Sequence, residues 1–235
     1  MKILALDTAT ENCSAALFIN GALLAREELL ERGHAQRILP LIHELLQEAG
    51  LDLPALDAIA FGRGPGAFTG VRLAASVTQG LAFGAQRPVV PVSDLRALAQ
   101  RALQDSGLDR VLVGTDARMQ EVYCGAFERG PGGLAVAVGP ERVSPPQSVR
   151  LPQEWAGGPK PLAVGSGFAA YPPLRAAMAA DVQGFLEALW PRALEIALLA
   201  LPEVAAGRAR PPEEALPVYL REDVAQPPRP GLPRS

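Results

Sequence analysis

Cysteine and aromatic residues are scarce in this chain. Of its 235 residues only Cys13 and Cys124 are cysteine; they lie far apart, and no Cys-x-x-Cys motif occurs. This spacing argues against a disulfide framework or a thiolate metal site, and the apolar alternation around both residues predicts small core side chains. Aromatic residues make up 5% of the chain, so aliphatic side chains and alanine must fill most of the core.

Positive charge is limited as well. Only Lys2 and Lys160 are lysine, the other basic residues are arginine, and the formal net charge is −3. A protein that gripped RNA mainly through its own phosphate contacts would usually have a basic excess. We therefore expect any nucleic acid to be contacted only indirectly, through another protein.

Long hydrophobic runs and common catalytic motifs are missing from the sequence. No apolar run approaches the roughly 18 residues of a membrane span, and the apolar start meets Asp7 too early for a signal-peptide core. We expect a cytoplasmic protein without membrane contact. There is also no Walker A loop, no Gly-x-Gly-x-x-Gly fingerprint and no nucleophile elbow, so hydrolase chemistry has little support.

The first half of the chain shows a regular order of strands and helices. Apolar alternation predicts strands at 2–7, 13–19 and 22–30, and Asn20-Gly21 predicts a type I′ hairpin turn between the last two. A helix at 34–49, a strand at 56–61, a helix at 69–84, a strand at 88–92 and a Ser93-capped helix to about 105 follow. Pro40 predicts a kink or a late start of the first helix. This is the order of a ribonuclease-H-like lobe.

The pattern then begins again, which predicts a second, duplicated lobe. Asp116 ends an apolar strand as Asp7 does, and Phe18 and Phe127 follow in the next strands; both pairs are 109 residues apart. The rest is less regular: a Pro- and Gly-rich stretch at 140–161, a strand at 162–164, a helical stretch at 185–206 and an extended segment at 217–221. We divide the chain into a lobe at 1–105, a less regular lobe at 106–221 and a Pro-rich flexible tail at 222–235.

Two loops could contact a phosphate. The segment GRGPGAFTGVR at 62–72 joins a strand to a helix, so the amides of Gly64 and Gly66 could face an anion at the helix start. The alternative is a tight turn that lets strand and helix pack closely, which the residues alone favour slightly. Gly165 and Gly167 could form an adenosine-side turn.

Asp7 and Asp116 end equivalent strands, where an acid can organise metal and phosphate, and Thr8 and Thr10 could add hydroxyl groups. The alternative is that each Asp stabilises its own turn. We favour this alternative for Asp116, and for Asp7 both interpretations stay open.

The only histidines, His34 and His43, are nine residues apart. On one helix this spacing places them on opposite sides, so they cannot share a metal. We expect no metal site, and we expect His34 to act as a cap or contact residue.

Two helices carry apolar or small-residue stripes. The first has Ile38, Leu41, Ile42 and Leu45 on one side, with Leu39 and Leu46 widening it; the second has Gly70, Ala74, Val77 and Leu81. The alternative is ordinary burial against the sheet. Because the wide stripe exceeds the needs of one sheet contact, we expect it to be partly exposed in the free lobe and to bind a partner or a second copy.

Five segments in order resemble the TsaB (YeaZ) family of tRNA-modification subunits. They are ILALDTAT at 3–10, HAQRILP at 34–40, the Gly-rich segment at 62–72, DARMQEVY at 116–123 and PVYLR at 217–221. The chain departs from the family pattern at Ala67, where Ser is common, and at Gln120, where Gly is common.

The resemblance implies an actin-like (ASKHA) α/β fold of two lobes. It implies a noncatalytic subunit that supports a TsaD-type catalytic protein, with a TsaE-type ATPase, in threonylcarbamoyl transfer to N6 of the adenosine 3′ to the tRNA anticodon. It implies no required cofactor, with weak ATP or ADP binding at most, and a homodimer in isolation. It also implies that the first two helices form both the homodimer contact and the contact with the TsaD-type protein. The residues expected at this interface are His34, Ile38, Leu41, Ile42, Leu45, Thr69, Val71, Ala74, Val77 and Leu81. The alternative is an ATP-dependent small-molecule kinase of the same superfamily.

Overall fold

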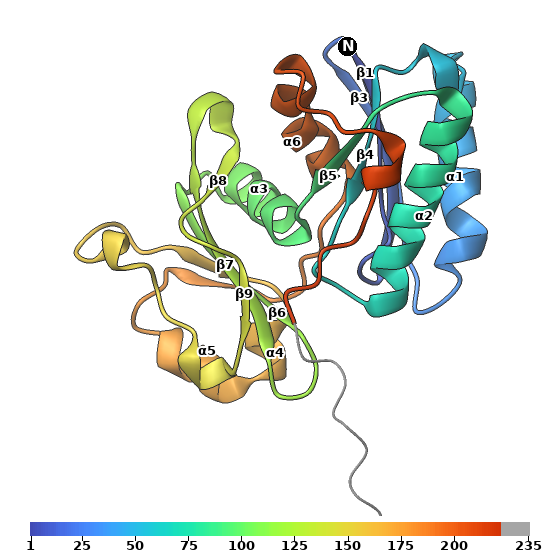
Figure 1. Ribbon diagram of the computed structural model, residues 1–235. Coiled ribbons are helices and arrows are strands. Elements are labelled where there is room, and N and C mark those ends of the chain that lie inside the picture. The colour runs from blue at the N-terminus through green and yellow to red at the C-terminus, as the bar shows by residue number, and fades with distance from the viewer. Residues whose placement is uncertain (222–235) are drawn as a thin grey trace, which may run out of the picture.

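The first lobe is built on a five-stranded sheet in the order β3-β2-β1-β4-β5. The computed structural model describes residues 1–221, so the tail expected at 222–235 lies outside the described residues. The strands are β1 (Lys2–Asp7), β2 (Asn12–Ile19), β3 (Ala22–Leu29), β4 (Ala58–Gly62) and β5 (Val89–Val92). Helices α1 (His34–Ala49) and α2 (Phe68–Ala85) cover one face of this sheet, and α6 (Ala193–Ala205) covers the other (Figure 1).

The second lobe repeats this plan around β6 (Arg110–Asp116). Its sheet has the order β11-β10-β6-β7-β8, and β9 also pairs with β7. The remaining strands are β7 (Val122–Arg129), β8 (Ala135–Ala137), β9 (Arg142–Ser144), β10 (Leu162–Val164) and β11 (Gly184–Leu186). Helix α3 (Asp94–Ser106) packs on one face, and α4 (Gly167–Ala170) and α5 (Pro172–Met178) pack on the other. Single-turn 3₁₀ helices lie at Leu53–Ala55, Pro131–Gly133, Pro146–Ser148, Gln153–Trp155 and Pro212–Glu214.

The duplication is confirmed in topology. Both β1 and β6 pair antiparallel with the next strand and parallel with a later one, β4 or β10. Phe18 lies opposite Ile3, whereas Phe127 lies opposite Val111 rather than Leu112. The paired residue lies four positions before Asp7 in the first lobe but five before Asp116 in the second, so the aspartates and the phenylalanines cannot both be structurally equivalent.

Several local predictions are confirmed. Asn20 and Gly21 have φ values of 49° and 105°, as a type I′ turn requires. Helix α1 has the predicted bounds, so the late start considered because of Pro40 is wrong. Ser93 accepts a hydrogen bond from the Arg96 amide and caps α3. Both cysteines are buried and free.

The predicted helix at 185–206 is wrong in its first part. Residues 184–186 form strand β11, which pairs in parallel with β10, and the helix begins only at Ala193. A short apolar run around Phe185 fits a buried strand as well as a helix, and periodicity does not separate the two. Pro202 does not break the helix but lies inside it.

The end of the described chain returns to the first lobe. Helix α6 belongs to the segment 106–221, yet it packs on β1, β2 and β4. Residues 207–221, here called the strap, continue along the same lobe: Arg210 forms a β-bridge with Val89, and the Val218 amide donates to the Arg63 carbonyl at 2.8 Å. The segment 106–221 thus supplies elements to both lobes. No helix within residues 1–221 is long and apolar enough to cross a membrane.

Candidate functional site

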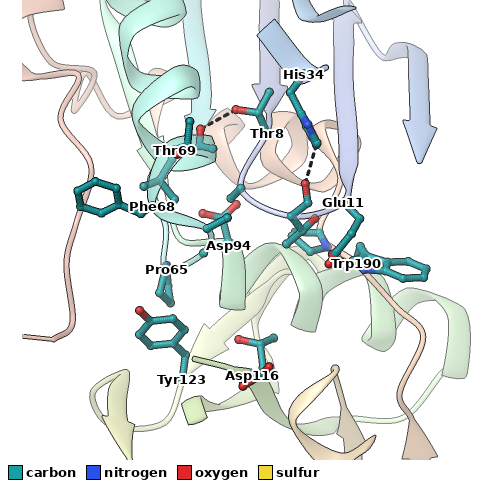
Figure 2. Close-up of a pocket in the computed structure, with 18 of the residues that line it drawn as sticks. Thr8, Glu11, His34, Pro65, Phe68, Thr69, Asp94, Asp116, Tyr123 and Trp190 are labelled. Carbon is teal, nitrogen blue, oxygen red and sulfur yellow. Dashed lines mark hydrogen bonds between the residues drawn. The ribbon is translucent and has the colours of Figure 1, made fainter. Parts of the chain in front are cut away.

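A cleft of about 1090 Å³ lies between the two lobes (Figure 2). The first lobe contributes the loop after β1, the start of α1 and the Gly-rich loop before α2. The second lobe contributes the ends of β6 and the following turn, and the strap closes one side. Lining residues include Thr8, Thr10, His34, Gly66, Phe68, Thr69, Asp94, Asp116, Trp190, Tyr219 and Arg221.

The Gly-rich loop is packed against the loop that follows β1. A Cβ atom at Gly66 would lie 2.5 Å from the Ala9 carbonyl oxygen, and one at Gly70 would overlap the Thr8 carbonyl. The Thr8 hydroxyl donates to the Gly70 carbonyl at 2.7 Å, and the Ala67 amide donates to the Ala9 carbonyl at 2.8 Å. The glycines thus let the start of α2 approach the first strand closely. Gly64 is buried, and its amide donates to the Asp94 carboxylate instead of facing the cleft.

Asp7 and Asp94 form a buried pair of carboxyl groups beneath the cleft. Asp7 Oδ1 accepts a hydrogen bond from the Ala9 amide at 2.9 Å. Within residues 1–221, Asp7 Oδ2 and Asp94 Oδ1 have no hydrogen-bond partner, and a Cβ atom at Gly62 would clash with both acids. Burial raises the pKa of Asp7 to about 6, and burial together with the Asp7 charge raises the pKa of Asp94 well above its usual value. The two facing carboxyl groups therefore hold a proton more readily than free aspartates do.

Sequence reasoning missed Asp94, which it treated only as the first residue after a helix cap. The carboxyl ends of the parallel strands β1, β4 and β5 meet at one edge of the sheet. Because α3 begins directly after β5, its first residue reaches the same edge as Asp7. That juxtaposition depends on strand order, which no local sequence signal carries.

Asp116, the acid at the end of β6, is hydrogen-bonded and ion-paired to its neighbours. Asp116 Oδ1 accepts hydrogen bonds from the Arg118 amide and the Tyr171 hydroxyl, both at 2.8 Å, and Oδ2 lies 3.0 Å from the Arg118 guanidinium. This arrangement fits the turn-stabilising interpretation. Gly165 and Gly167 pack against the Gly114 carbonyl of β6, and only the residue between them, Ser166, lines the cleft.

The other polar candidates at the cleft are also bound locally. Thr10 accepts a hydrogen bond from the Asn12 amide, and its carbonyl lies 2.8 Å from His34 Nε2 (Figure 2). His34 thus contacts the neighbouring loop from the start of α1, whereas His43 is exposed. Within residues 1–221, no three His, Cys, Asp or Glu side chains are close enough to hold a metal ion.

The expected exposure of the apolar stripe on α1 is wrong. Ile38, Leu41, Ile42 and Leu45 are 0–3% exposed and belong to the core beneath the helix. On α2, Val71 and Ala74 are equally buried, Val77 and Leu81 are partly buried, and Thr69 is exposed. The stripe is buried because α1 packs on β2 and β3 of the sheet, and its residues share one core with residues of α2.

Exposed apolar side chains do lie on the outer sides of the same helices. Leu39 of α1 is 49% exposed and Phe83 of α2 is 55% exposed. A further exposed cluster that sequence reasoning missed joins the start of α2 to the strap: the Arg72 guanidinium stacks 3.5 Å from the Phe68 ring centre and donates to the Tyr219 hydroxyl at 2.8 Å.

Comparison with known proteins gives matches along the whole chain. The family described as "TsaD: tRNA N6-adenosine threonylcarbamoyltransferase" matches residues 27–163, more than half of the chain. The "tRNA threonylcarbamoyladenosine biosynthesis protein TsaB" of Escherichia coli (strain K12) is 41% identical over 98% of this chain and 99% of its own. Its counterpart in Haemophilus influenzae is 53% identical over 52% of each chain.

Solved structures of similar proteins support the same family assignment. The "YeaZ from Pseudomonas aeruginosa" is 44% identical, covers 93% of this chain and 99% of its own, and has a TM-score of 0.82. A second structure, of an uncharacterized protein from Pseudomonas aeruginosa with similarity to peptidase YEAZ, is 45% identical with a TM-score of 0.84 and covers 94% of this chain and 99% of its own. The sequence motifs, the duplicated α/β lobes and these matches together establish that the chain belongs to the TsaB (YeaZ) family, with an actin-like fold.

Proposed function

We propose that this chain is a noncatalytic subunit in tRNA threonylcarbamoyladenosine biosynthesis. In this role it binds and supports a TsaD-type catalytic subunit that works with a TsaE-type ATPase, and it meets tRNA only through that complex. Full-length similarity to a relative named for this pathway supports the proposal.

One observation carries the noncatalytic assignment: the cleft groups that a phosphate or metal would need are engaged with each other. Asp7 faces Asp94, Asp116 is bound by Arg118 and Tyr171, and the Gly-rich loop is packed on Thr8 and Ala9. An ATP-dependent small-molecule kinase needs free carboxylates for Mg²⁺ and free amides for phosphate. We therefore favour the subunit over the kinase and expect at most weak ATP or ADP binding.

We place the partner surface on the outer sides of α1 and α2. Leu39 and Phe83 are exposed there, whereas the inner stripe is buried and unavailable to a partner. His34, Thr69, Val77 and Leu81 remain accessible in part and can border the contact. The same surface would serve a homodimer when the chain is isolated, so the two assemblies would compete.

The test is co-purification with a TsaD-type protein, followed by modification of unmodified tRNA with and without this chain. Leu39→Glu and Phe83→Glu should each weaken association at least tenfold while the variants stay folded. Leu186→Glu is the matched control, because Leu186 is 40% exposed on β11 of the other lobe. Undiminished association of both helix variants would contradict the surface, and full tRNA modification without this chain would contradict the function.

Calorimetric titration with ATP and Mg²⁺ distinguishes the kinase alternative from the noncatalytic subunit. Tight binding by the isolated chain, together with phosphate transfer to a small molecule, would overturn the noncatalytic assignment. Weak binding without turnover is the expected result.

A further inference from the structure

The strap connects the two lobes at its end. Along most of its length it is attached to the first lobe: Ala215 is 2% exposed in the first core, and the Val218 amide donates to the Arg63 carbonyl. Arg221 then leaves this lobe and binds the second. Its Nε donates to the Glu121 carboxylate at 2.9 Å, and its Nη2 donates to the same carboxylate and to the Ala117 carbonyl.

The segment that Arg221 binds is a turn with unfavourable backbone dihedral angles. Arg118, Met119 and Gln120 have φ values of 62°, 53° and 61°, so three successive residues with side chains occupy the left-handed region. Residues with side chains are sterically disfavoured in this region, and the conformation persists only where surrounding contacts impose it. Strain of this kind concentrates at sites that bind or switch.

Two sets of contacts impose the conformation. From within the second lobe, the Asp116 carboxylate accepts from the Arg118 amide, and the Glu121 amide donates to the Arg118 carbonyl at 3.0 Å. From the strap comes Arg221, which binds Ala117 and Glu121 on either side of the strained residues and lies 3.4 Å from the Met119 sulfur. Its side chain is 17% exposed, so water weakens the ion pair less than at an open surface.

The lobes are joined separately at the far end of the cleft. There Trp190 Nε1 donates to Glu11 Oε2 at 3.1 Å, and Asn12 Nδ2 donates to the Pro191 carbonyl at 3.2 Å. In Figure 2, Trp190 and Phe68 lie at opposite ends of the cleft, and Tyr219 of the strap lies beside Phe68, with 6.2 Å between ring centres. Helices α3 and α6 also pack together between the lobes, so lobes that stay fixed there and at the far end can still hinge at the strap end.

We propose that Arg221 is an interlobe latch: it fixes the cleft mouth at the strap end and holds the turn at 117–121 in its strained conformation. When the latch is released, the mouth widens and the turn relaxes towards ordinary backbone angles. The latch therefore determines how wide the cleft mouth is and how the turn positions the exposed Met119 side chain. The proposal concerns this chain alone and does not depend on the function proposed above.

The test uses the full chain with spin labels on Ser76→Cys of α2 and Ala176→Cys of α5, two exposed positions in different lobes. Because Cys13 and Cys124 are buried, the labels react at the introduced sites. Pulsed electron–electron double resonance measures the distance between the two labels, and hence between the lobes. Hydrogen exchange with mass spectrometry measures the exchange rate of the backbone amides in the turn at 117–121. Arg221→Ala should broaden the distance distribution towards longer values and speed exchange of the turn by about tenfold.

Two further variants test whether the effect of Arg221→Ala is specific to the contacts of this arginine. Arg221→Lys keeps the charge but cannot reach Glu121 and Ala117 together, so it should give an intermediate effect. Arg210→Ala is the matched control: Arg210 lies in the same strap and pairs at 3.8 Å with Glu214, also in the strap. An unchanged distance distribution and exchange rate in Arg221→Ala, or an equal change in Arg210→Ala, would overturn the latch.

Discussion

Replacing Asp7 with asparagine should stabilise this protein at alkaline pH. In the folded chain Asp7 is fully buried beside Asp94, and burial raises its pKa to about 6 from the ordinary 3.8. An asparagine keeps the useful contacts, because its carbonyl oxygen can accept from the Ala9 amide and its amide group can donate to Asp94. It removes only the negative charge that burial disfavours.

The magnitude follows from the two pKa values of Asp7. Because the folded pKa lies above the unfolded one, the contribution of Asp7 to stability is complete below pH 3.8 and is lost as the pH rises through about 6. The difference is roughly two pKa units, at about 1.4 kcal/mol each, so the loss is about 3 kcal/mol. Asp7→Asn avoids this loss and also removes the charge that helps raise the pKa of Asp94.

Urea denaturation at pH 5 and pH 8 measures the effect. The free energy of unfolding of Asp7→Asn should exceed that of the parent chain by about 3 kcal/mol at pH 8 and by clearly less at pH 5. Asp52→Asn is the control, because Asp52 is an exposed acid of the same lobe without a side-chain cap hydrogen bond. Equal or lower stability of Asp7→Asn at pH 8, with the pH dependence of the parent chain, would refute the reasoning.

Three other predictions concern backbone strain and packing. Gln120→Gly should raise the free energy of unfolding by about 1 kcal/mol in thermal or urea melts, because φ is 61° there; no gain would argue against strain in the turn. Gly70→Ala should cost about 2 kcal/mol because its Cβ would overlap Thr8, whereas Gly80→Ala on the same helix meets nothing within 4 Å and should gain about 0.5 kcal/mol. Leu45→Arg should prevent folding, as judged by circular dichroism, because Leu45 is fully buried; Leu39→Arg should fold normally.

The parts of the fold that sequence predicted well have local causes. The Asn20-Gly21 turn follows from the backbone freedom of two residues, and the start of α3 follows from the Ser93 hydroxyl. Helix α1 follows from one apolar stripe. In each case the decisive interaction lies within a few residues of chain, so the sequence carries the whole signal.

The errors concern contacts between distant segments. The α1 stripe correctly identified the apolar side of the helix, but periodicity does not say what covers that side; here α1 packs on the sheet and Leu45 is completely buried in the core. The Asp7–Asp94 pair and the grip of Arg221 on Glu121 likewise join residues that only the strand order and the returning strap bring together.

The return of α6 to the first sheet has a consequence for synthesis on the ribosome. Ile3, Ala5 and Ala60 face α6, so this side of the first sheet stays bare until residue 205 has been made. The first lobe therefore cannot finish folding ahead of the second, although its strands emerge first. During that interval the nascent chain presents an apolar sheet face to other molecules, and such a surface is prone to aggregation.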